Sequence, residues 1–391
     1  MPLFSADLLI PVGSDPIVNG WVQTDDIGTI LETGSGKAPG NATVLKGIVI
    51  PGFVNAHCHI ELSYLRQRIT EKSGMTGFIR QLMSIRNNTN EAVQKMGITE
   101  ACEEMLRNGI VAVGDISNSS NSAAVKNESP LLFHTFLEVA GLADVKAESI
   151  LSNAREMTHA FRGKNQKIGL TPHAPYSVSN RLMQQVIEQI EKSGSPLSIH
   201  LQESEDELEF CSTGSGPMAE FFNESGFDFS KFSFSKDAPI RKLIPLFQNI
   251  QHVVLVHNTF TTTDDIRWAE SMHHGIFWCL CPKANLYITG KLPPVSELFR
   301  HAKNIVVGTD SLASNDSLDI LSELKVIAKP YPEIPFVELI KWGTLQGARA
   351  LQLENQLGSI EAGKKPGLLL VENIQTDNPV ITSTTSVRRI I

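Results

Sequence analysis

Four histidines and one aspartate stand where apolar stretches of the sequence end. His57 and His59 are two positions apart, and alternation along a strand places positions i and i+2 on the same face. His200, His257 and Asp310 each follow another apolar stretch rich in Val, Leu or Ile. Imidazole nitrogens together with one carboxylate suit Zn²⁺ or Fe²⁺, and a catalytic site of this kind keeps one position open for water. The spacing therefore predicts a metal site built from the ends of several strands.

Other residues near these positions have both a functional and a structural interpretation. His173 could contact a polar group of a substrate or cap the rigid turn between two prolines, and Glu61 could bind a substrate hydroxyl or support a ligating histidine. Asn285 is a candidate for lining a substrate pocket. Cys279 and Cys281 are also two positions apart, but two cysteines alone do not close a zinc site. We expect both thiols to be buried as small apolar groups.

The stretches that end in these residues belong to a regular alternation of strands and helices. His57 and Asp310 are 253 positions apart over seven intervals, about 36 residues each, close to the roughly 31 residues per unit of a 250-residue eight-fold barrel. Apolar residues at helical spacing occupy the intervening segments 77–87, 90–109, 181–194 and 336–353. The predicted strands are 48–57, 109–116, 131–139, 167–173, 197–202, 252–258, 275–281 and 304–310.

This alternation predicts an α/β fold, a (β/α)8 TIM barrel, over residues 51–354. The stretch 131–139 is ambiguous because it could also begin a helix. The two ends of the chain differ from this middle part, because they consist of short apolar runs separated by Gly, Pro and Asn. We expect residues 1–50 and 355–391 to join in a small composite β-sandwich. The insertion 204–250, rich in Phe, Gly and Ser, is either a substrate lid or a solvent loop with a small core of its own.

Composition excludes several classes of protein. The 391 residues carry a formal net charge of −8 without basic blocks, which argues against nucleic acid or an anionic membrane as a partner. Five cysteines in a chain of this length argue against a disulfide framework. No leader and no apolar run of about 18 residues are found, so we expect a cytoplasmic protein. A small-molecule substrate fits these features, and a homodimer is compatible with them.

Six motifs in this order resemble those of the amidohydrolase superfamily: PGFVNAHCHIE, TPHAPYSVS, SIHLQESEDE, VLVHN, CPKANLYI and GTDSLASN. The chain is most similar to the deaminase and chlorohydrolase branch, which includes cytosine deaminase, methylthioadenosine/S-adenosylhomocysteine deaminase and aminodeoxyfutalosine deaminase. The resemblance covers nearly the whole chain and implies the same barrel and the same small β-sandwich. One departure is Gly367, which follows Pro366 in a terminal motif where that family usually has an aspartate.

The resemblance also implies roles for individual residues. Glu203 matches the glutamate that shuttles protons, and His257 matches the histidine that faces the metal-bound water. The segment KIGLTPHAP has no lysine placed to bridge a second metal, which implies a mononuclear site. The implied ligands of a single divalent metal, Zn²⁺ with Fe²⁺ as the alternative, are His57, His59, His200 and Asp310.

These roles together predict a metal-dependent aminohydrolase. Asp310 can accept a proton from the metal-bound water, His257 can hydrogen-bond the developing alkoxide, and Glu203 can protonate a ring nitrogen and then the leaving ammonia. We expect hydrolytic deamination of a heterocyclic amine, first a 6-aminopurine nucleoside or another adenosine derivative. The alternatives are a guanine or cytosine deaminase and a triazine-type chlorohydrolase. A non-catalytic barrel scaffold is the alternative of another class, but it should have lost ligands that are all present here.

Overall fold

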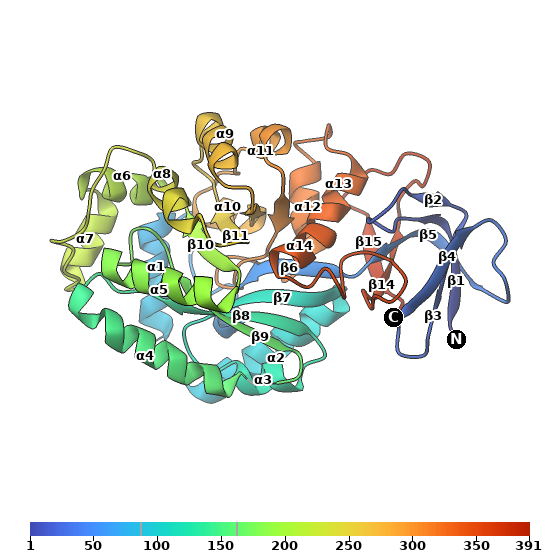
Figure 1. Ribbon diagram of the computed structural model, residues 1–391, viewed down its shortest axis with the longest axis horizontal. Helices are drawn as coiled ribbons and strands as arrows, with labels where there is room; N and C mark the ends of the chain where they lie inside the picture. Colours follow the sequence, from blue (N-terminus) through green and yellow to red (C-terminus); the bar gives the residue numbers. More distant parts are fainter. Residues whose placement is uncertain (87, 162) are drawn as a thin grey trace.

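Two parallel sheets carry the strands that the sequence analysis placed at the centre of the fold. The computed structural model describes residues 1–86, 88–161 and 163–391 (Figure 1). One sheet has the order β6 (Phe53–Cys58), β7 (Ile110–Ser117), β8 (Leu132–Val139) and β9 (Gln166–Pro172). The other sheet has the order β10 (Leu197–Leu201), β11 (Val253–His257), β12 (Ile276–Leu280) and β13 (Ile305–Val307). Every neighbouring pair within these sheets is parallel.

Backbone hydrogen bonds connect the two sheets at both of their edges. The amide of His200 donates to the carbonyl of His173 over 3.0 Å, which links the end of β9 to β10. The amides of Thr309 and Asp310 donate to the carbonyl of His57 over 3.0 and 3.1 Å, which links the end of β13 to β6. The carboxyl ends of all eight parallel strands therefore meet on one side of the molecule.

Helices follow the strands, and local sequence signals explain where they begin and end. In α5 (Asn180–Ser193), the side chain of Ser179 accepts a hydrogen bond from the amide of Leu182, and the helix stops at Gly194, whose φ is +66°. The remaining helices are α1 (Gly74–Arg86), α2 (Glu91–Arg107), α3 (Ala123–Glu128), α4 (Ala147–Met157), α6 (Glu205–Thr213), α7 (Pro217–Glu224), α8 (Pro239–Leu243), α9 (Thr263–Met272), α10 (Pro282–Ile288), α11 (Val295–His301), α12 (Ile320–Ala328), α13 (Phe336–Trp342) and α14 (Leu345–Ala350). Short 3-10 helices are η1 (Ile60–Leu65), η2 (Asp144–Lys146), η3 (Thr158–Ala160) and η4 (Ile244–Phe247).

All eight predicted strands are present, with two differences in how the segments divide. The ambiguous stretch 131–139 forms β8. The stretch 48–57 is divided at Gly52 between β5 (Thr43–Pro51) and β6. A Cβ on Gly52 would lie 2.6 Å from the carbonyl oxygen of Pro366, so this close approach requires glycine. The predicted helix 336–353 is likewise divided, into α13 and α14. The predicted helix 77–87 corresponds to α1, and its last residue, Asn87, lies outside the described residues.

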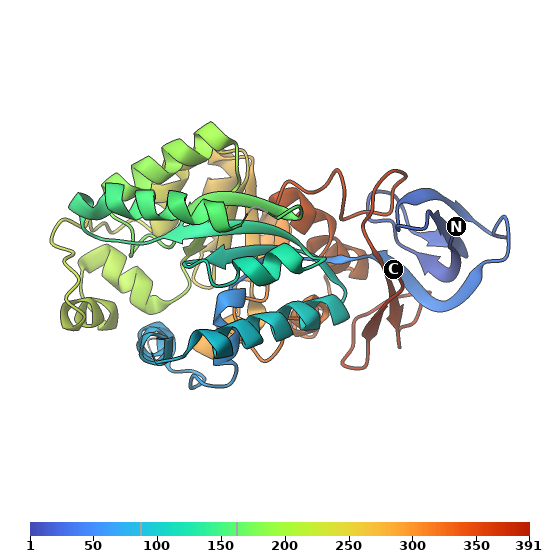
Figure 2. The ribbon, with the colours of Figure 1, turned by 90° about the horizontal axis from the view of Figure 1, so that it is seen from below.

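The two ends of the chain form one seven-stranded sheet at one end of the molecule (Figures 1 and 2). Its order is β15-β14-β5-β1-β3-β4, with β2 paired to β1. The pairs are antiparallel except for β1 and β5, and β14 joins the sheet beside β5. The further bounds are β1 (Leu3–Leu9), β2 (Ile17–Val18), β3 (Gly20–Thr24), β4 (Ile30–Ser35), β14 (Leu368–Glu372) and β15 (Ser386–Arg389). Residues from both ends of the sequence thus share one sheet.

The insertion 204–250 folds into α6, α7, α8 and η4, and its aromatic residues form a satellite core. The ring of Phe210 lies 5.0 Å from that of Phe222 and 5.3 Å from that of Phe229, measured between centroids. This core extends onto α1, because Met75 and Phe78 belong to the same apolar cluster. The amide and hydroxyl of Thr76 also donate to the carboxylate of Asp206. The insertion therefore packs beside α1 on the side where the parallel strands end.

Two expectations from composition can be compared with the structure. All five cysteines are buried free thiols, so they form no disulfide framework. Along the described residues, no helix combines the length and the apolar character that crossing a bilayer requires.

A buried ion pair lies beneath the strand ends. The ammonium group of Lys126 is fully buried, pairs with the carboxylate of Asp115, and donates to the hydroxyls of Ser117 and Thr135 over 3.0 Å each. Asp115 Oδ1 in turn accepts a hydrogen bond of 2.8 Å from the amide of Ile60, directly after His59 in the chain. The pair thus connects α3, β7 and β8 to the turn that follows β6.

We predict that Lys126→Met lowers the free energy of unfolding by about 3–5 kcal/mol, because it leaves the Asp115 carboxylate buried without its partner. Urea denaturation measures this difference. The control is Lys192→Met, since Lys192 is exposed and lies 3.9 Å from Glu188 on the same helix face. That exposed pair should contribute less than about 1 kcal/mol. Equal effects of the two substitutions would contradict the prediction.

Candidate metal centre and active site

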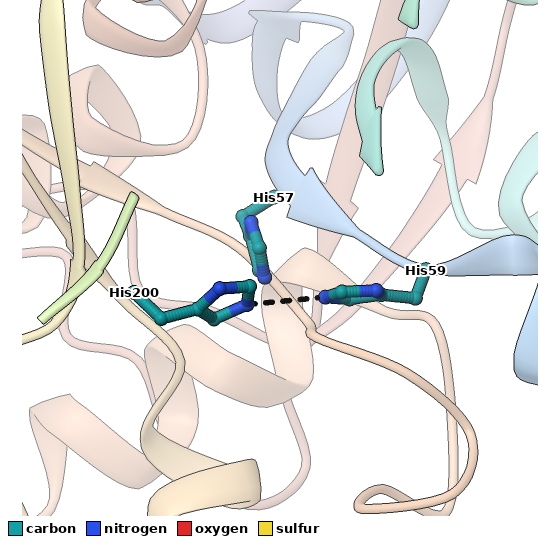
Figure 3. Close-up of side chains that lie close together, drawn as sticks. All are labelled: His57, His59 and His200. Carbon is teal, nitrogen blue, oxygen red and sulfur yellow. Dashed lines mark hydrogen bonds between the residues drawn. The ribbon is translucent and has the colours of Figure 1, made fainter. Parts of the chain in front are cut away.

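Four donor atoms from three strand ends converge in the middle of the two parallel sheets. His59 Nε2 and His200 Nε2 are 3.2 Å apart, and the ring of His57 stands edge-on to both (Figure 3). Asp310 Oδ1 lies 3.8 Å from His57 Nε2 and 3.6 Å from His59 Nε2. Metal–nitrogen bonds of roughly 2.0–2.1 Å at tetrahedral angles place ligand atoms about 3.3 Å apart. The observed separations therefore fit one small divalent metal ion.

The burial of His57 is a second observation that fits a metal ion at this place. Its side chain is fully buried, and neither ring nitrogen has a hydrogen-bond partner among the described residues. A buried polar group without a partner costs about 1–3 kcal/mol. A metal ion held by Nε2 would remove part of that cost, so the residues present fit a metal ligand set.

Neighbouring groups orient the other donors. His200 Nδ1 donates to the carbonyl of His173 over 2.9 Å, so the lone pair of the neutral ring is on Nε2, the nitrogen nearest His59. Asp310 Oδ2 accepts a hydrogen bond of 2.6 Å from Ser314, which leaves Oδ1 facing the histidines. Burial lowers the pKa of His200 to about 4, so this ring is neutral at pH 7 and can ligate a cation.

The backbone is strained where the functional strands end. Gln202, His257, Asn258 and Asp310 have φ values of +50°, +75°, +55° and +55°. This region is uncommon for residues other than glycine, and such strain persists only where the surrounding structure enforces it. These positive φ values turn the chain sharply after β10, β11 and β13. Two of them belong to the predicted site residues His257 and Asp310.

Glu203 and His257 form a second part of the site. Glu203 Oε1 is 3.4 Å from His257 Nε2, and both side chains are buried. Burial, followed by the negative charges of Asp310 and Glu207, holds the pKa of Glu203 well above its usual range. Glu203 is therefore suited to carry a proton at neutral pH and to act as an acid.

The loop that carries Glu203 is held by a carboxylate from the next helix. Glu207 accepts hydrogen bonds of 2.9 Å from the amides of Gln202 and Glu203. The hydroxyl of Ser204 caps α6 by accepting from the amide of Glu207. In a capping box, the N-cap residue and the third helical residue bond each other. Here Ser204 bonds Glu207 in that way, but the carboxylate of Glu207 bonds the two amides before the N-cap.

Asn285 contacts His257 and is absent from the residues that line the pocket beside the metal-site residues. Its amide nitrogen lies 2.6 Å from the hydroxyl of Thr259 and 3.4 Å from His257 Nδ1. If the amide donates to Nδ1, the proton of the neutral ring is on Nε2, which faces Glu203. The structure thus places Asn285 behind His257, where it can orient the ring.

A pocket of about 350 Å³ opens beside the four donors and is bordered by His59, His173, His200, Glu203, His257 and Asp310. One wall is apolar and comes from α1 and the satellite core, including Met75, Phe78, Leu82, Phe221 and Phe222. The other wall is polar and contains Arg86, Asn118 and Glu138. An elongated ligand with one apolar and one polar part would match these walls.

Glu61 does not border this pocket. Its Oε2 accepts hydrogen bonds from the amides of Asn118 and Ser119 over 3.1 and 3.2 Å and from the hydroxyl of Ser119 over 2.9 Å. Its Oε1 lies 3.2 Å from Arg86 Nη2. The structure places Glu61 beneath the polar wall, where it holds the loop after β7.

Sequence reasoning singled out His57, His59, His173, His200, Glu203, His257 and Asp310. The structure places the last six around this pocket, and the fully buried His57 lies next to His59 and His200. It did not identify Glu138 or Glu207 as members of the site. A signal for Glu138 was present, because it stands near the end of β8 as His200 does in β10. For Glu207 the signal was the Ser-x-x-Glu spacing of a capping box.

Comparison with known proteins identifies the family of this chain. The sequence pattern of the amidohydrolase family matches residues 48–389. The chain belongs to the amidohydrolase family. It is 31% identical to an adenosine deaminase of Helicobacter pylori over 82% of this chain and 78% of that protein. It is 28% identical to a 5-methylthioadenosine/S-adenosylhomocysteine deaminase of Moorella thermoacetica over 83% of this chain and 73% of that protein.

Solved structures of amidohydrolases have the same fold. The aminofutalosine deaminase of Helicobacter pylori, in complex with methylthio-coformycin, superposes with a TM-score of 0.80 at 26% identity and covers 96% of this chain and 93% of its own. An adenosine deaminase of Xanthomonas campestris with bound zinc has a TM-score of 0.73 at 22% identity, covering 95% of this chain and 84% of its own. At that identity the second likeness concerns the fold alone.

We predict that His57→Ala and His200→Ala each remove the bound metal, because each deletes a nitrogen of the donor set. Elemental analysis of protein purified without chelator and supplemented with zinc should give about one equivalent per chain for the wild type and less than about a tenth for the variants. His274→Ala is the control, since His274 is exposed. A wild type with less than about half an equivalent, or variants that keep their metal, would contradict this ligand set.

Proposed function

We propose that this amidohydrolase removes ammonia hydrolytically from an adenosine derivative, using one divalent metal held by His57, His59, His200 and Asp310. Zn²⁺ is the first choice and Fe²⁺ the alternative, because both suit imidazole with one carboxylate. The observation that carries the proposal is the Glu203–His257 pair, 3.4 Å apart and buried beside the four donors. Such a site places an acid and a hydrogen-bond donor next to a metal-activated nucleophile.

When bound, the metal would lower the pKa of a water molecule to about 7. Asp310 accepts a proton from the attacking water at its carboxylate. Glu203 donates its proton to the ring nitrogen beside the carbon that carries the amino group, and His257 donates from Nε2 to the oxygen that develops negative charge. The proton of the added hydroxyl then passes through Glu203 to the amino group, so that NH₃ leaves as the ring carbonyl forms, and the proton held by Asp310 restores Glu203.

The walls of the pocket support an adenosine derivative as the substrate. Adenosine, 5′-deoxyadenosine, methylthioadenosine and S-adenosylhomocysteine, after which similar deaminases are named, share the adenine base and differ at the 5′ position. The apolar wall from α1 and α7 offers Phe78, Leu82, Phe221 and Phe222 to a base and to an apolar 5′ substituent. Burying such a substituent contributes about 0.8 kcal/mol per methylene group.

The finer architecture forms part of the same proposal. The hydrogen bonds at both sheet edges support one closed (β/α)8 barrel over residues 51–354. Ile30 of β4 and Leu368 of β14 share one apolar cluster although several strands separate them in the sheet order. This contact supports a sheet that folds over itself into the predicted sandwich of residues 1–50 and 355–391.

We predict that Glu203→Gln lowers kcat for ammonia release by at least about 100-fold, because the amide cannot carry the proton that must be transferred. Metal content should stay at about one equivalent. Glu205→Gln is a matched control two positions along the same segment, because Glu205 is exposed and pairs with Lys291. Turnover that Glu203→Gln leaves unchanged would remove Glu203 from the mechanism.

A substrate screen tests the reaction itself. Ammonia release should be seen with adenosine, 5′-deoxyadenosine and 5′-methylthioadenosine, and kcat/KM should be about tenfold higher for the methylthio compound than for adenosine because of the apolar wall. Guanine, cytosine and a chlorotriazine are the comparison compounds, the last assayed for chloride. Release from one of these alone would replace the proposal by a guanine or cytosine deaminase or a chlorohydrolase. No turnover with any compound by metal-loaded protein would favour a non-catalytic barrel.

A further inference from the structure

A buried carboxylate outside the pocket connects two loops that carry site residues. Glu323 lies on α12, is fully buried, and is absent from the residues that line the pocket. Its Oε1 accepts a hydrogen bond of 2.7 Å from the side-chain amide of Asn315, in the loop after β13. Its Oε2 accepts a hydrogen bond of 2.9 Å from the backbone amide of Lys283, at the start of α10. One side chain thus bonds both loops at once.

Through Asn315, this carboxylate acts on the backbone of the metal ligand Asp310. The side-chain amide of Asn315 has two protons, of which one is donated to Glu323 and the other to the carbonyl of Thr309 over 2.8 Å. Thr309 directly precedes Asp310, whose φ of +55° is uncommon for residues other than glycine. Such a conformation persists only where the surrounding structure enforces it. Glu323 therefore holds the amide group that fixes the chain at Asp310.

The second hydrogen bond of Glu323 fixes the helix that lies behind His257. The first amides of a helix have no acceptor within the helix, and the N-cap residue of α10, Cys281, supplies none from its side chain. Glu323 gives the amide of Lys283 the acceptor that an N-cap side chain usually provides. Asn285 follows on the same helix, with its amide nitrogen 3.4 Å from His257 Nδ1. The orientation of α10 therefore determines where this amide meets the imidazole.

The two loops also meet near the surface, but that contact is weaker. The ammonium group of Lys283 pairs with Asp316 and donates to the hydroxyl of Ser317 over 3.0 Å, and both residues directly follow Asn315. Asp316 is exposed, and exposed ion pairs contribute little. Hydrogen bonds to a buried, ionised carboxylate are stronger. The link through Glu323 is therefore the one that keeps the loops in place.

We propose that Glu323 is a positioning residue that holds Asp310 and His257 in their working arrangement from outside the pocket. It acts through Asn315 on the metal ligand and through the start of α10 on the imidazole. This inference rests on the proposed function and adds to it a residue that contacts neither substrate nor metal. Removing a group that orients a metal ligand typically costs about 10–100-fold in metal affinity or activity.

The experiment compares Glu323→Ala with the wild type in two measurements. The Kd for zinc, measured by competition with a chelator, should rise by about tenfold or more. In the zinc-saturated enzyme, kcat for 5′-methylthioadenosine should fall by about tenfold or more while KM stays within about threefold, because Asp310 and His257 act on the transition state. Glu323→Gln keeps the side-chain volume but has a single accepting oxygen, so zinc affinity or kcat should still fall by about tenfold.

Glu270→Ala is the matched control for loss of a buried glutamate. Glu270 lies on α9, is buried, and accepts hydrogen bonds from the indole of Trp278 and the amide of Lys303. Its removal should lower the midpoint of urea unfolding much as Glu323→Ala does, because both leave two donors without an acceptor. Zinc affinity and kcat of Glu270→Ala should stay within about threefold of the wild type.

Two double-mutant cycles test the routes by which Glu323 acts. Glu323→Ala combined with Asn315→Ala should bind zinc within about threefold of Asn315→Ala alone, because Asn315 transmits the effect. Glu323→Ala combined with Asn285→Ala should likewise lose less kcat than the product of the two single losses. Fully additive losses in either cycle would overturn the corresponding route.

Equal effects of Glu323→Ala and Glu270→Ala on zinc affinity and kcat would overturn the positioning role in favour of a purely structural one. A wild type that binds zinc but releases no ammonia would overturn the proposed function, while the zinc affinities would still decide whether Glu323 positions Asp310. A wild type that binds no zinc would overturn both proposals.

Discussion

Burying an imidazole without a hydrogen-bond partner is unfavourable, and this constraint organises the centre of the molecule. His57 is enclosed on every side, and no group among the described residues pairs with either of its nitrogens. Its neighbours are arranged so that three imidazoles and one carboxylate converge. The parallel strands supply this arrangement, because side chains at and just beyond their carboxyl ends point to the same side of the fold. His257 and Asp310, at the same strand ends, have positive φ values, which are strained for residues other than glycine.

The carboxylates of the site share a buried environment and differ in their partners. Burial raises the pKa of Asp310 to about 6 and holds those of Glu203 and Glu138 above their usual range. Asp310 faces the histidines, Glu203 faces His257, and Glu138 Oε2 accepts a hydrogen bond from the side-chain amide of Asn118. Desolvation is common to the three groups, so their partners distinguish them. Glu207 adds a fourth carboxylate, whose hydrogen bonds hold the backbone beneath Glu203.

Much of this arrangement could be predicted from sequence, and the exceptions share a cause. The strands were identified because Val, Ile and Leu runs ending in His or Asp are local signals, and even 131–139 formed β8. Glu138 was overlooked because a glutamate near the end of an apolar strand is common, and only its place beside the pocket distinguishes it. The structure also places Glu61 and Asn285 one layer behind the pocket walls. Which side of a loop a side chain faces depends on packing between distant segments, which no local pattern records.

The sequence by itself determined the order of strands and helices, the family, and the residue types able to hold a metal and transfer a proton, because these follow from periodicity and from motifs of adjacent residues. The tertiary structure decided which donors meet and which are already satisfied. His59 and His200 are 141 positions apart in the chain and 3.2 Å apart between their nitrogens. Asn118 and Glu138 become one wall of a pocket because β7 and β8 are paired in register. Contacts of this kind are properties of the packed chain, since desolvation and hydrogen-bond competition act only after distant segments come together.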